Sequence, residues 1–173
     1  MKKLNLLPFI LLFAFAVILP SCSNDDDDDA TSNSFTFNGN TVDIVNGFLF
    51  PFGDNGNGSF DFDVYLTTDG ITQGGAFGLT GIGDLVYLDL NSGSSTGLES
   101  GTYSWSSSRD PFTIVDGLVA SDFDVTTNSG TSTDATGGTV EVEVNGNEVT
   151  LTIDLETTSG SRITGFYNGV LIQ

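Results

Sequence analysis

The chain has 173 residues, in which four Lys and Arg stand against 23 Asp and Glu, with no His and a single Cys. The formal net charge of −19 excludes a role in nucleic-acid binding, which needs a basic surface. Without His, neither a Ser-His-Asp nor a Cys-His nucleophile system can be built, and an ordinary zinc site lacks its ligands. We therefore do not expect an enzyme.

The N-terminus has the anatomy of a bacterial lipoprotein signal. Lys2 and Lys3 precede an apolar run over residues 4–19, and the run ends in Leu19-Pro20-Ser21-Cys22. A positive start followed by a short apolar segment is typical of a signal peptide, and the run is shorter than the ~18–20 residues that span a bilayer. We expect residues 1–21 to be removed and Cys22 to carry the lipid.

The segment after Cys22 predicts a tether. Five consecutive aspartates, 25–29, lie in a stretch over residues 22–34 that is too polar to bury a core. A cysteine followed by such an acidic tag resembles the surface lipoproteins of the Bacteroidetes type. The resemblance implies a protein on the cell surface, anchored in the outer membrane by several acyl chains, such as palmitate, on Cys22.

Residues 35–173 predict one antiparallel all-β domain, because apolar residues alternate with polar ones between Gly-, Asn- and Asp-rich turns. We expect eight to ten strands, arranged as a β-sandwich or as a calycin-like up-and-down barrel. Long loops are expected over residues 53–59, 91–97 and 128–138. The strand candidates are residues 35–38, 41–52, 60–68, 76–79, 85–90, 101–106, 118–126, 139–144, 149–156 and a final strand from about 162.

Two turns near the C-terminus predict strand registers. A two-residue turn at Asn145-Gly146 would place Val142 opposite Val149. A three-residue loop at residues 158–160, with Gly160 in the left-handed position, would place Arg162 opposite Glu156. In both hairpins apolar side chains then face one another across the strands.

Aromatic residues suggest either a core or a binding surface. Phe48, Phe50 and Phe52 share one face of a strand, as do Phe60 and Phe62, and we expect these five to be core. Tyr103 and Trp105 share a face, and Phe166 and Tyr167 lie on a strand that is apolar on both faces. The four speculative ligand-binding residues are Tyr103, Trp105, Phe166 and Tyr167.

Acidic residues offer two weaker candidates. The pairs Asp61/Asp63, Asp122/Asp124, Glu141/Glu143 and Asp154/Glu156 each place two carboxylates on one strand face, which is also what the solvated face of any acidic sheet shows. The oxygen-rich loop from residue 54 to 61 suggests a speculative Ca²⁺ site, although an ordinary hairpin loop fits as well. Its ligands would be Asp54, Asn55, Asn57 and Asp61.

The sequence as a whole resembles small β-rich Bacteroidetes lipoproteins of uncharacterised function, through Gly101-Thr102-Tyr103 and the closing run 163–169. These motifs imply no activity. We expect a membrane-anchored protein with a non-catalytic binding or accessory role, whose partner is a glycan, a small apolar ligand or another surface protein. The alternatives are a structural or adhesive surface protein without a pocket and a carboxylate-dependent glycan hydrolase.

Overall fold

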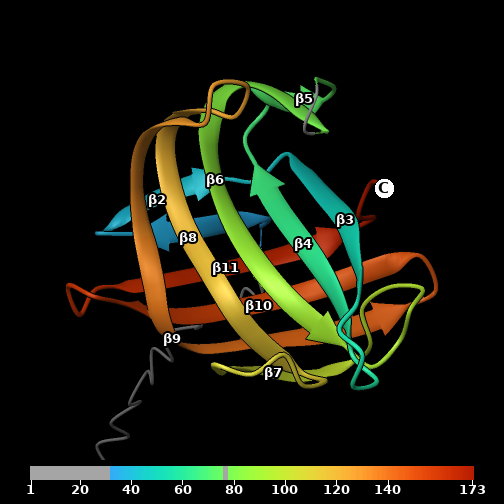
Figure 1. Ribbon diagram of the computed structural model, residues 1–173. Coiled ribbons are helices and arrows are strands. Elements are labelled where there is room, and N and C mark those ends of the chain that lie inside the picture. The colour runs from blue at the N-terminus through green and yellow to red at the C-terminus, as the bar shows by residue number, and fades with distance from the viewer. Residues whose placement is uncertain (1–31, 76–77) are drawn as a thin grey trace, which may run out of the picture. The chain divides into compact units, whose positions relative to one another are not determined.

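A computed structural model describes residues 32–75 and 78–173 of the chain, so the expected signal peptide and Cys22 lie outside the described residues. The described part is built from strands and loops (Figure 1). Within it, no helix has the length and apolar character needed to cross a membrane. The strands are β1 (Ser34–Phe37), β2 (Asn40–Asp43), β3 (Asn46–Asp54), β4 (Phe60–Thr67), β5 (Ile71–Gln73), β6 (Leu79–Ser92), β7 (Gly101–Trp105), β8 (Thr113–Asp124), β9 (Ser129–Asn145), β10 (Glu148–Thr157) and β11 (Arg162–Gly169).

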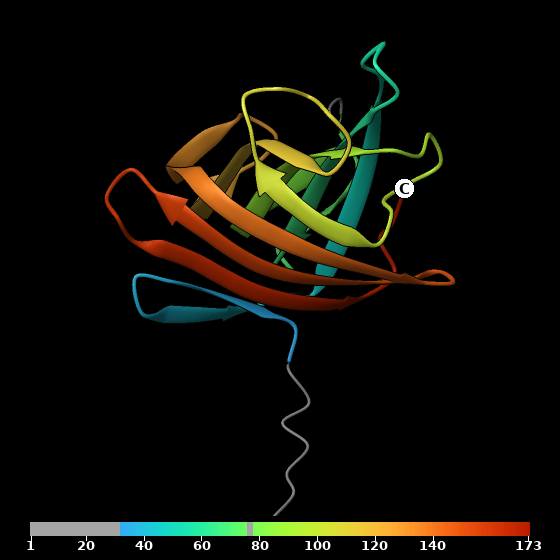
Figure 2. The same cartoon turned by 90° about the horizontal axis from the view of Figure 1, so that it is seen from below.

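The strands form one sheet in the order β2-β1-β11-β10-β9-β7-β8-β6-β4-β3, with β5 paired to β6. All pairings are antiparallel except β7 with β8, and β9 also pairs with β8. The sheet is not closed, but it folds over itself into two layers, seen from below in Figure 2. The expected all-β, largely antiparallel domain is confirmed. The arrangement is sandwich-like, with eleven strands among the described residues rather than eight to ten.

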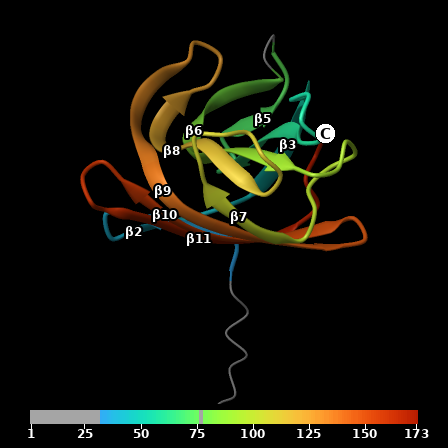
Figure 3. The ribbon, with the colours of Figure 1, turned by 60° about the horizontal axis from the view of Figure 1, so that its bottom comes forward.

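β9 carries the sheet from one layer to the other. Its first part pairs with β8 over residues 129–134, and its last part lies between β10 and β7 (Figure 3). Gly138 lies at the change of direction with φ of +110°, and a Cβ there would lie 2.2 Å from the Asp154 carbonyl oxygen. Because only glycine fits this approach, Gly138 allows β9 to turn without breaking its pairing to β10.

One hairpin register is confirmed and the other is wrong by two residues. Glu156 pairs with Arg162, and Gly160 has φ of +78°, as expected. In the preceding hairpin, Val149 pairs with Val144 rather than with Val142, because Asn145 still pairs with Glu148 and the turn is Gly146-Asn147. A shift by two residues keeps the same side chains on the buried face, so the alternation of apolar residues could not distinguish the two registers.

Two predicted boundaries are wrong, and a third lies partly outside the described residues. The candidate strand 41–52 is two strands, because the Ile44 N–H bonds to Asn33 in one layer and the Val45 N–H bonds to Thr67 in the other. The expected loop 128–138 is mostly β9, since pairing with β8 and then with β10 satisfies its backbone despite its Ser, Thr and Gly content. Of the expected short strand 76–79, residues 76 and 77 lie outside the described residues and Leu79 begins β6. The short strand β5, at Ile71–Gln73, was not expected.

The sheet has apolar residues on both sides of β3, β4, β6 and β8. The main core lies between the layers and includes Val64, Leu88 and Leu151, each fully buried. A second cluster lies on the outer face and includes Phe48, Leu85 and Ala120. β3, at one end of the sheet, also contacts the chain after β11, where the Ile172 N–H donates to the Gly47 carbonyl at 2.9 Å.

Candidate functional site

The candidate site lies on the outer face of β4 and β6. On these strands Val64 and Leu88 point into the main core, so their neighbours in the sequence point outward. The register places Tyr65 opposite Tyr87 and Asp63 opposite Asp89. Two tyrosines and two aspartates therefore lie side by side on one face, in two successive rungs.

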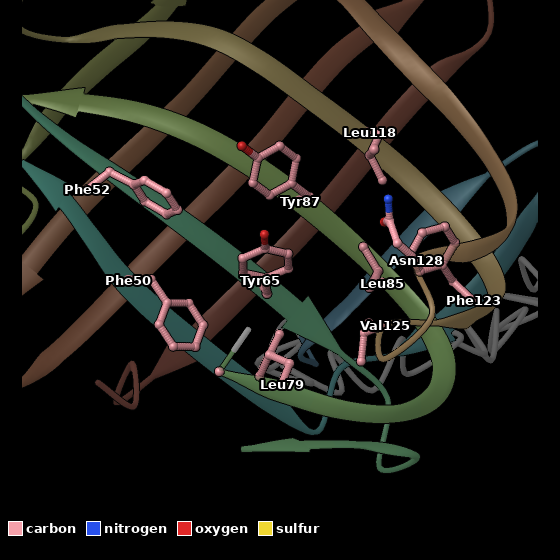
Figure 4. Close-up of a pocket in the computed structure, with 11 residues that line it drawn as sticks. Phe50, Phe52, Tyr65, Leu79, Leu85, Tyr87, Leu118, Phe123, Val125 and Asn128 are labelled. Atoms are coloured by element: carbon pink, nitrogen blue, oxygen red, sulfur yellow. The ribbon is translucent and has the colours of Figure 1, made fainter. Parts of the chain in front are cut away.

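Aromatic and aliphatic side chains form a groove around the two tyrosines, which we call the aromatic groove (Figure 4). Its volume is about 690 Å³, within the range of pockets that take small organic ligands. Tyr65 and Tyr87 lie at its centre, between residues from β3 and residues from β8 and the turn after it. The other lining residues are Phe50, Phe52, Gly78, Leu79, Leu85, Leu118, Phe123, Val125 and Asn128.

The rings of the groove are in contact with one another. The Tyr65 and Tyr87 ring centres are 5.0 Å apart, and the Phe50 ring meets Tyr65 edge-on at 5.9 Å. Phe52, in contrast, is 70% exposed and makes no aromatic pair among the described residues. A large apolar side chain held in solvent beside such a groove is available to contact a ligand.

Three carboxylates lie next to the groove, and we call Asp61, Asp63 and Asp89 the acid cluster. One oxygen of each lies within 4.8 Å of the other two. Arg109 donates to both oxygens of Asp89, at 3.0 and 2.8 Å, and to Asp61 at 2.6 Å. The Tyr87 hydroxyl donates to Asp63 at 2.9 Å and so connects the cluster to the groove.

Burial changes the acidity of these groups. It raises the pKa of Asp63 to about 6, and the nearby charge of Asp89 adds to the rise, while the hydrogen bond from Tyr87 opposes it. Burial also raises the pKa of Asp89 to about 6, against the hydrogen bonds from Arg109. The pKa of Tyr65 and of Tyr87 is raised, again mainly by burial, so both hydroxyls remain protonated at neutral pH.

The residues predicted to bind Ca²⁺ are used for hydrogen bonds within the protein. Asp54 accepts from the Gly56 N–H at 2.7 Å, and the Asn55 amide donates to Ser59 and Asn91. Asn57 bonds to the Arg109 carbonyl, and Asp61 lies in the acid cluster instead. Three of the four residues therefore take part in hydrogen bonds of the loop, and Asp61 forms an ion pair with Arg109.

Of the four aromatic residues predicted to bind a ligand, three lie in or against the main core. Tyr103 is fully buried, and its hydroxyl bonds to the backbone of Glu99. Trp105 packs against the main core. Tyr167 is buried and donates to the Val170 carbonyl, whereas Phe166 is on the opposite face of β11, beside a shallow depression. Tyr103 and Tyr167 thus contribute to the core rather than to a binding surface.

The aromatic groove was missed because the phenylalanines of β3 were expected in the core. Phe62 is a core residue as expected and Phe48 is buried in the outer cluster, but Phe50 and Phe52 line the groove. The signal that could have found the groove is the matching pattern Asp63-Val64-Tyr65 and Tyr87-Leu88-Asp89. In antiparallel strands these two patterns align Tyr with Tyr and Asp with Asp.

In comparisons with known proteins, no family model, no curated protein and no solved structure matches this chain. The fold and the groove define an all-β protein with an aromatic groove on the outer face of its sheet.

Proposed function

We propose that the protein is a lipid-anchored protein of the outer cell surface that captures a small, largely apolar ligand in the aromatic groove and has no catalytic role. The observation that carries the proposal is the groove itself, with five aromatic rings among its eleven lining residues. Apart from the two tyrosines, Asn128 is the only polar side chain among the described residues that line the groove. A glycan needs many hydrogen-bonding partners, so this lining favours an apolar ligand.

Substituting Phe52 with alanine is expected to weaken ligand binding about tenfold, because roughly half of a phenylalanine's burial energy is then lost from the complex. Binding of Nile red, a neutral apolar dye, to the full-length protein measures the effect through the dye's fluorescence. Folding stability should not change, since Phe52 is 70% exposed. Val170→Ala is the matched control, because Val170 is 55% exposed and lies outside the groove. Equal loss in both variants, or no loss in either, would contradict the groove as the binding site.

Replacing Cys22 with alanine is expected to release the protein from the membrane fraction, because the proposed lipid would then have no attachment point. Sedimentation of membranes, followed by detection of the protein in pellet and supernatant, measures the change. Ser23→Ala, one residue further on, serves as the control and should stay in the pellet. If the Cys22→Ala protein still pellets with membranes, the lipoprotein assignment is wrong.

A second candidate, carboxylate-dependent hydrolysis of a glycan, is supported by the raised pKa of Asp63 and Asp89 beside the groove. Both oxygens of Asp89, however, accept hydrogen bonds from Arg109. Because both oxygens are occupied, Asp89 is poorly placed to exchange a proton with a substrate, and we favour binding over catalysis. Glycan cleavage that disappears in Asp63→Asn would reverse this preference.

A further inference from the structure

The acid cluster carries more negative charge than its arginine compensates. Arg109 forms ion pairs with Asp61 and Asp89. Asp63 is only 7% exposed, yet among the described residues no cation pairs with it. Asp116 lies on the neighbouring strand β8, directly opposite Asp89, and adds a further acid beside the cluster. Burying a carboxylate that has no ion-pair partner destabilises the folded protein, so binding of a cation next to Asp63 would be favourable.

The uncompensated carboxylate lies directly beside the aromatic groove. Asp63 is two residues from Tyr65 on the same face of β4, and it accepts the hydrogen bond from Tyr87. Both tyrosines line the groove. A ligand lying on their rings can therefore extend one end toward Asp63 while its body remains between apolar walls.

We propose that the aromatic groove binds an organic cation, a ligand with a flat apolar body and one protonated amine or quaternary ammonium group that pairs with Asp63. This inference rests on the proposed function and names its ligand class. The faces of Tyr65 and Tyr87 attract a cation through their ring quadrupoles, and the carboxylate supplies the opposite charge. The volume of about 690 Å³ accommodates a ring system of two fused rings.

Three probes of one shape test the inference: 1-naphthylmethylamine, the neutral 1-naphthalenemethanol and the anionic 1-naphthoate. Their affinities for the full-length protein are measured by equilibrium dialysis at pH 7.5, where the amine is protonated and Asp63 is ionised. The amine is expected to bind about tenfold more tightly than the alcohol, and the naphthoate more weakly than both. Asp63→Asn should lower the binding affinity of the amine to that of the alcohol. The affinity of the alcohol itself should not change.

Glu141→Gln is the matched control, because it removes one exposed acid from β9, which carries no groove residue. It should leave the ratio of amine to alcohol affinity unchanged. Each variant is compared with the unchanged chain in the same preparation, so uptake of probe outside the groove cancels.

The outcomes separate this inference from the proposed function. Equal binding of amine and alcohol would overturn the cation preference but leave the groove as an apolar binding site. If the Asp63→Asn protein still prefers the amine to the alcohol, the preference comes from the general acidity of the surface. This result too would overturn the inference. If none of the three probes binds, both the inference and the proposed capture of apolar ligands fail.

Discussion

Replacing Asp63 with asparagine is expected to stabilise the folded protein at pH 7 by about 3 kcal/mol and to have little effect at pH 3.5. The carboxyl pKa is about 6 in the folded protein and 3.8 without its surroundings, and each pKa unit corresponds to about 1.4 kcal/mol. The folded state binds the proton more tightly than the unfolded state does. The contribution of Asp63 to stability is therefore fully present below pH 4 and is lost as the pH rises toward 6 and beyond.

Denaturant unfolding of the unchanged protein and of Asp63→Asn between pH 3.5 and pH 7.5 measures this difference. The two curves should coincide at the acidic end and diverge as the pH rises through the interval between 4 and 6. Glu141→Gln removes an exposed acid and reports the general repulsion within a chain of net charge −19. A difference between Asp63→Asn and the unchanged protein that does not vary with pH would show that the Asp63 carboxyl is not perturbed by burial.

Replacing Arg109 with alanine is expected to destabilise the protein by about 2 kcal/mol at pH 7. Asp89 is 5% exposed and would lose both of its charged hydrogen bonds. Breaking a fully buried ion pair costs roughly 3–5 kcal/mol, and the smaller value is expected here because the Arg109 side chain is 42% exposed. The substitution should also raise the pKa of Asp89 further, so the loss should be larger at pH 7 than at pH 5.

Arg162→Ala is the control for Arg109→Ala. Arg162 also contacts two acids, Asp154 and Glu156, but all three side chains are about half exposed or more. Exposed pairs of this kind contribute little, because water solvates the separated charges. Comparable destabilisation in both variants, measured by denaturant unfolding, would mean that Arg109 does not act through the buried Asp89.

Much of the sheet could be predicted from local patterns. The loop ending in Gly160 determines the pairing of Glu156 with Arg162, because a three-residue turn with a left-handed glycine allows one register. The secondary structure of residues 128–138 could not be predicted in this way. Their Ser, Thr and Gly content is typical of a loop, and pairing with β8 and with β10 makes them a strand.

The candidate site was harder to predict than the fold, because its residues come from strands whose neighbours are not given by the sequence. The sequence places Phe50 and Phe52 on one face of β3. It does not show whether that face meets the other layer or lies on the outside, where the groove is. Arg109 lies 20 residues from Asp89 in a loop, and no local pattern indicates their pairing. Such a contact follows only from the assembled sheet.

The N-terminal strands have a consequence for how the chain folds. β1 pairs with β2 and with β11, where Ser34 lies opposite Phe166, and the start of β3 bonds to Ile172. The sheet therefore cannot be completed until β11 has been synthesised. Contacts between such distant segments form slowly, since long loops must close first. A chain whose sheet is completed late stays longer in the extended form in which a polypeptide can be threaded across a membrane, and the proposed export would require this form.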